Sequence, residues 1–152
     1  MATTPNAQPA SKATIAWGWC LLALVVGEFV LLLLANIGNL VANRWFGTAG
    51  AQSADGGIVG VSTLLAVMLG GYLAGRWAGR AGLYQGIVVA IGFIVWGAAF
   101  QFITEASTVA GSLSSGSHTL VDLGPMNLGN VFTGDLLALF GGSVGGLLSG
   151  KR

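Results

Sequence analysis

The stretch Gly70–Gly86, which reads GGYLAGRWAGRAGLYQG, joins two apolar runs and decides the fold. Residues 58–69 before it and 83–103 after it are rich in aliphatic and small side chains. About 20 predominantly apolar residues suffice for a helix to cross a bilayer core. The sequence therefore predicts a helical hairpin in a membrane. Because short loops rich in Lys and Arg stay in the cytoplasm, Arg76 and Arg80 place the connection on that side.

The composition of the whole chain indicates a membrane protein. Of the 152 residues, 54 % are hydrophobic and 7 % are charged, whereas soluble domains carry about 25 % charged residues. This leaves too little charge to coat a water-exposed surface. The net charge of +1 gives no reason to expect nucleic acid as a partner. Cys20 is the single cysteine, so an internal disulfide is excluded.

Four spans follow from the hydropathy pattern, and together they predict an all-α integral membrane four-helix bundle. Residues 1–14 are polar and are expected to form a disordered cytoplasmic tail, and residues 15–152 to form a single transmembrane domain. We expect its helices at about 15–41, 58–77, 83–103 and 128–148. For the first, a cleaved signal peptide is the competing interpretation. The apolar run is longer than the usual roughly 7–15 residues and contains Glu28, which favours an uncleaved span.

The distribution of basic residues predicts both termini in the cytoplasm of a multi-pass plasma-membrane protein. With this topology, Arg44 is the one basic residue outside. The residues that determine the topology are Arg76, Arg80, Lys151 and Arg152.

Glycines at every fourth residue form a stripe on the second and on the fourth predicted span. Such stripes let helix backbones approach closely in a membrane. The predicted packing positions are Gly71, Gly75, Gly79, Gly142, Gly146 and Gly150. A shift of the chain by 71 residues superposes the two stripes and aligns Arg80 with Lys151. This match predicts a parallel repeat of two helical hairpins, with the high content of Gly and Leu as the competing explanation.

Polar residues inside the spans form the second candidate site. At about 100° per residue, Glu28 shares one helix face with three asparagines of the first span. Asp135 lies in the fourth span at a depth close to that of Asn36 and Asn39. The predicted intramembrane polar cluster is Glu28, Asn36, Asn39, Asn43 and Asp135. It has two interpretations, a polar clamp that holds the first and fourth helices in register or a path along which the two acids exchange protons or cations.

No motif in the chain predicts catalysis, a metal or a cofactor. His118 has no second His or Cys with metal-ligand spacing. The serines near it lack the strand–turn–helix context of a nucleophile. The glycine-rich segment GGSVGG at 141–146 lacks the lysine of a phosphate-binding loop and lies within a span.

The segments GGYLAGRWAGRAGLYQG and GGSVGGLLSGKR resemble the YrzE-like family of small, glycine-rich, four-span bacterial membrane proteins. The resemblance covers about the last three spans. It implies the four-span topology in a bacterial inner membrane and supplies no catalytic residue.

Two functions remain open from the sequence. The first is a non-enzymatic structural or accessory protein, because small residues in excess of what one bundle uses suggest contacts with other membrane subunits or with further copies of the chain. The second is a small proton or cation channel or carrier that works through Glu28 and Asp135.

Overall fold

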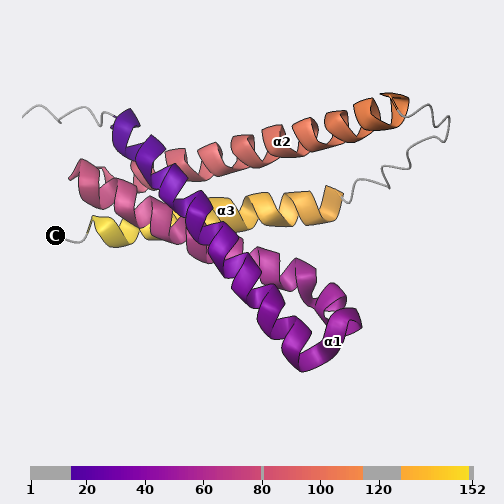
Figure 1. The fold of residues 1–152 in the computed structure, drawn as a ribbon. Helices are drawn as coiled ribbons and strands as arrows, with labels where there is room; N and C mark the ends of the chain where they lie inside the picture. Colours follow the sequence, from indigo (N-terminus) through magenta and orange to yellow (C-terminus); the bar gives the residue numbers. More distant parts are fainter. Residues whose placement is uncertain (1–14, 80, 115–127, 151–152) are drawn as a thin grey trace, which may run out of the picture.

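The computed structural model describes residues 15–79, 81–114 and 128–150, and every element in these ranges is a helix. α1 spans Trp17–Ala78, α2 spans Gly82–Ser114 and α3 spans Leu128–Ser149. Within α1, Gly47 has φ 70° and ψ 178°, a conformation that is essentially restricted to glycine. The chain turns back at this bend, which divides α1 into a first arm (residues 17–46) and a second arm (residues 48–78). The two arms, α2 and α3 make a bundle of four helices (Figure 1).

Four helical segments are long and apolar enough to cross a membrane, as the sequence predicted. They are Trp17–Gly50, Gln52–Ala78, Gly82–Thr104 and Val131–Ser149. Their side chains are distributed as in a membrane protein: small residues such as Ala23, Ala66 and Ala74 are buried, whereas Phe29 and Phe100 are 67 % and 65 % exposed. An apolar exterior of this kind requires a lipid environment. The chain is therefore a multi-pass membrane protein.

The helices alternate in direction. Gly60, Leu64 and Met68 of the second arm lie near Leu137, Gly141 and Gly145 of α3, so these two helices run parallel. The first arm and α2 are parallel to each other in the same way and opposite to that pair, because Cys20, Leu24 and Gly27 lie near Gln85, Gly92 and Phe93. Successive helices are therefore antiparallel, as in any chain of four consecutive spans, so the predicted repeat of two hairpins stays a prediction.

One end of the bundle is tightly joined and the other is splayed. At the tight end, the rings of Trp19 and Trp77 have centroids 5.6 Å apart, and Gly75 lies against Ser149 at the end of α3. The beginning of α1, the α1–α2 connection and the end of α3 thus lie together, at the left of Figure 1. At the other end, the bend of α1 points away from α2 and α3 (Figure 1).

Two helices continue beyond the spans that hydropathy delimits. The segment between the predicted helices at about 15–41 and 58–77 is helical apart from the bend at Gly47, and α2 continues to Ser114 instead of ending near residue 103. At about 1.5 Å per residue, the 33-residue α2 is roughly 50 Å long, which exceeds a bilayer core of about 30 Å. The predicted tail at residues 1–14, and residues 115–127 between the third and fourth spans, lie outside the described residues.

Candidate functional site

Close backbone contacts among the second arm of α1, the beginning of α2 and α3 form a glycine seam. The seam is defined here by Gly71, Gly75, Gly82, Gly86, Gly142 and Gly146. A Cβ atom added at Gly71 would lie 2.7 Å from the carbonyl oxygen of Gly142, and one added at Gly75 would lie 2.9 Å from Cα of Gly82. A Cβ at Gly86 would meet the carbonyl oxygen of Gly142 and would lie 2.9 Å from Cα of Gly146. All six glycines are buried. α3 therefore packs into a groove between the second arm of α1 and the beginning of α2. The helix backbones are so close there that the seam positions have no room for a side chain.

Four of the six glycines singled out in the sequence belong to this seam, and two do not. Gly71 and Gly142, which superpose in the 71-residue shift, contact each other directly. Gly79 is exposed and ends α1 in the left-handed conformation, with φ 65° and its N–H donating to the carbonyl of Gly75. This is the usual role of glycine after a helix C-terminus. Gly150 is exposed beyond the end of α3, and a Cβ added there would meet only carbonyl oxygens of its own helix, no closer than 3.7 Å.

Sequence reasoning missed the part of the seam that α2 contributes. Gly82 and Gly86 have the same four-residue spacing as the glycines of α1, and this spacing was the available signal. Gly141 and Gly145 were also missed. They lie beside the seam and face the backbone of Leu64, Met68 and Tyr72 on the second arm.

The predicted polar cluster is not brought together. The side-chain amide of Asn36 donates to the carbonyl oxygen of Leu32 at 2.7 Å, and that of Asn43 donates to the carbonyl oxygen of Asn39 at 2.9 Å. These bonds lie within the first arm, and both donor side chains are exposed. Asp135 is half-buried in α3, and no hydrogen bond or ion pair joins it to Glu28 or to these asparagines in the described part of the chain. The first arm and α3 diverge, and this divergence is the physical reason why the predicted contact between Asp135 and the first arm is absent.

A polar depression lies at the bend of α1, between its two arms. It is lined by Asn39, Asn43, Thr48, Gln52 and Asp55. Just before it the arms are in close contact, because a Cβ at Gly38 would lie 2.5 Å from a methyl carbon of Ile58. Part of the predicted asparagine stripe therefore faces the second arm instead of α3.

Gln85 forms a buried polar contact that sequence reasoning missed. Its side chain is fully buried, and its Oε1 accepts the N–H of Ala16 at 3.2 Å and the thiol of Cys20 at 2.9 Å. The first N–H groups of a helix have no intrahelical acceptor, so the amide oxygen stabilises the beginning of α1. The signal was a single amide in the apolar run LYQGIVV. This contact ties the first arm to α2 at the tight end of the bundle.

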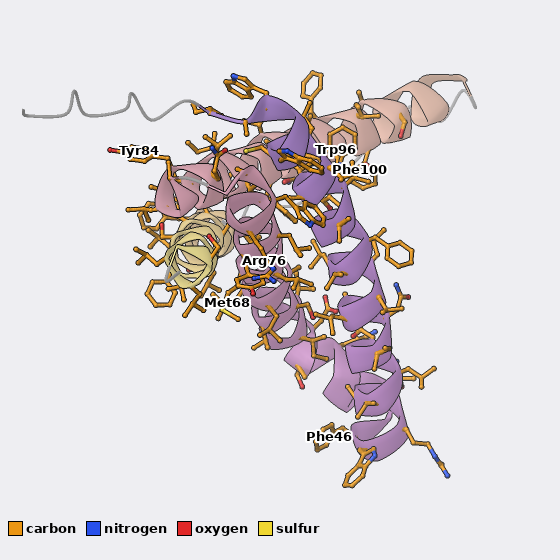
Figure 2. All side chains as sticks on the ribbon, turned by 90° about the vertical axis from the view of Figure 1, so that its left-hand side faces the viewer. Phe46, Met68, Arg76, Tyr84, Trp96 and Phe100 are labelled. Atoms are coloured by element: carbon orange, nitrogen blue, oxygen red, sulfur yellow. The ribbon has the colours of Figure 1, made fainter. Side chains whose placement is uncertain are left out.

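Of the predicted topology-determining residues, Arg76 lies exposed in the last turn of α1, at the tight end. Figure 2 labels it on the second arm, and Met68 two turns earlier. Arg80, Lys151 and Arg152 lie outside the described residues, as does His118.

Within the described ranges, no group of three or more His, Cys, Asp or Glu side chains is placed to hold a metal ion. The sites that the geometry does offer are thus the glycine seam, the exposed amides of the first arm, the polar depression at the bend and the half-buried acids of two spans. Comparison with family models, with curated proteins and with solved structures found no match to the chain.

Proposed function

We propose that this protein is a non-enzymatic accessory subunit of the plasma membrane that works by associating with other helices, either in further copies of the chain or in other membrane proteins. In the proposed topology both termini and the connection near Arg76 are cytoplasmic. The bend at Gly47 then lies on the outer side.

The exposed amide of Asn36 is the observation that carries this proposal. An amide group has two donors and an acceptor, and Asn36 uses one donor within its own helix. The residue lies inside the apolar segment Trp17–Gly50, and its side chain is exposed. Polar side chains within spans usually bond across helices, and each such bond contributes about 1–2 kcal/mol in model peptides. A partner helix is the natural acceptor for this amide.

The shape of the bundle supports the same function. The glycine seam holds the tight end together, so α3, α2 and the second arm form a fixed platform. The first arm extends from it with large apolar side chains on its outer face, such as Leu32 and Leu40, which are 61 % and 72 % exposed. This face is available to another helix in the membrane.

Purification from native membranes in a mild detergent tests the proposal. The wild-type protein and Asn36→Gln, which keeps the amide, should migrate on native gels as a complex larger than a single chain. Asn36→Leu, which removes the amide at similar volume, should migrate mainly as the single chain. A single chain in all three samples would contradict the proposal, and so would a complex that Asn36→Leu leaves unchanged.

Transport is the second candidate, because Glu28 and Asp135 are half-buried ionisable groups within spans. The structure favours transport less than the accessory function, because Glu28 and Asp135 lie at different levels along the bundle and no hydrogen bond joins them in the described part of the chain. Proton or cation flux into proteoliposomes that Glu28→Gln abolishes would establish transport in place of the accessory function.

A further inference from the structure

A second feature of the first arm is an apolar groove that it forms with α2. Its walls include Trp17, Leu21 and Leu24 from α1, and Gly92, Val95 and Trp96 from α2. The lining surface is almost entirely apolar. Leu24 packs on Gly92, where the missing side chain lets the two helices approach. Figure 2 labels Trp96 near the upper part of α1, in keeping with its place in the groove beside Trp17. Trp17 and Trp96 are 63 % and 56 % exposed, so the groove opens sideways toward lipid.

Glu28 lies on the face of α1 that forms the groove wall, beyond the last lining residue of α1, Leu24. It follows Leu24 by one helical turn, and at about 100° per residue it lies about 40° from Leu24 and about 20° from Leu21 around the helix. Glu28 is half-buried, and the described residues offer it no hydrogen bond or ion pair. The basic residues Arg44 and Arg76 lie near the bend and at the tight end, and neither forms an ion pair with Glu28. Glu28 is therefore an acid without a compensating charge among the described residues, one helical turn beyond the end of the apolar groove.

These two observations define the chemistry of a ligand. Apolar walls bind hydrophobic surface, and the face of a tryptophan ring attracts an organic cation. A carboxylate in a span needs a partner of opposite charge or a proton, because an isolated charge in a bilayer is costly. A single carboxylate supplies too few oxygen ligands for a dedicated divalent metal site. A lipid acyl chain would fit the walls but would gain nothing from Glu28.

We propose that the groove between the first arm of α1 and α2 binds a lipophilic organic cation, with its apolar groups between Trp17 and Trp96 and its positive charge at the carboxylate of Glu28. The ligand enters from the bilayer through the open side of the groove. This site is independent of the association with partner helices, because one chain contains all its parts.

Equilibrium binding of radiolabelled tetraphenylphosphonium to the full chain in phosphatidylcholine nanodiscs tests the site. Empty nanodiscs give the amount taken up by lipid alone. The wild-type protein should bind saturably, and Glu28→Gln should bind at least tenfold more weakly. Asp135→Asn is the matched control, since it neutralises the other span acid outside the groove, and it should bind as the wild type does.

Tetraphenylborate, which has the same shape and the opposite charge, provides a test that needs no variant. It should not compete with bound tetraphenylphosphonium. The proposal is overturned by uptake equal to that of empty nanodiscs, by equal binding to wild type and Glu28→Gln, or by equal competition from tetraphenylborate. The last two results would indicate a groove that lipid tails or any apolar molecule can fill. If Glu28→Gln does not give a helical, monodisperse protein, the competition experiment alone decides.

Discussion

Replacement of Gly71 by Ala adds one methyl group to the glycine seam at a contact between the backbones of α1 and α3. The new Cβ would lie 2.7 Å from the carbonyl oxygen of Gly142, 3.1 Å from its Cα and 3.3 Å from its carbonyl carbon. All three atoms belong to backbone, so no side chain can rotate away. Since carbon atoms pack best at about 3.5–4.0 Å, α3 and the second arm must separate by roughly 0.5–1 Å.

The cost of this separation can be worked out in order of magnitude. A gap of about 0.5–1 Å loses a quarter to a half of each dispersion contact along the seam, and overpacking of a tight interior typically costs about 1–3 kcal/mol. The higher helix propensity of Ala offsets up to about 1 kcal/mol. We therefore expect Gly71→Ala to lower the free energy of unfolding by about 1–2 kcal/mol.

Titration of the purified protein with SDS in mixed micelles, followed by circular dichroism, measures this change. Gly97→Ala is the matched control, because Gly97 is an exposed residue within α2 and a Cβ there would meet nothing within 4 Å. Gly97→Ala should leave the unfolding midpoint unchanged or raise it slightly. If Gly71→Ala is as stable as the wild type, or if both variants lose the same amount, close backbone packing does not stabilise this bundle.

Three further predictions concern the bend, the buried amide and the topology. Gly47→Ala should lower the free energy of unfolding in the same SDS titration by about 1–3 kcal/mol, because its φ of 70° and ψ of 178° strain any residue with a side chain. Gln85→Leu should lower the free energy of unfolding by about 1–3 kcal/mol, because the hydrogen bonds to the amide are lost. Cys20, which is 3 % exposed in the wild type, should then react faster with maleimide. An unchanged rate would contradict the contact between Gln85 and Cys20. In a Cys20→Ala background, a membrane-impermeant maleimide should label Asp55→Cys in intact cells and Gly150→Cys only after permeabilisation, and the reverse pattern would refute the proposed orientation.

The sequence by itself determined the four spans and part of the seam. Bilayer thickness sets a minimum length of apolar helix, so hydropathy along the chain is enough to count spans. The four-residue spacing of Gly71, Gly75, Gly142 and Gly146 is likewise a local property, because it places residues on one stripe of any helix. Both features are independent of how the helices are arranged.

Hydropathy did not locate the helix ends around the bend. Residues such as Thr48, Gln52 and Asp55 are polar, so the predicted first span ended before them and the second began after them. A helix outside the bilayer needs no apolar residues, and Ala49 and Ala54 favour helix in this segment. The chain therefore stays helical on both sides of Gly47, where φ and ψ alone make the turn.

Only the tertiary structure decided which faces meet. Whether Gly82 and Gly86 join the seam depends on the direction in which α2 leaves the turn after Gly79, and periodicity within a helix contains no such information. The same holds for Gln85, whose partners Ala16 and Cys20 lie 69 and 65 residues away. Equal depth in the membrane had suggested a contact between the first arm and Asp135, but depth is one coordinate, and the splay of the helices separates residues that share it.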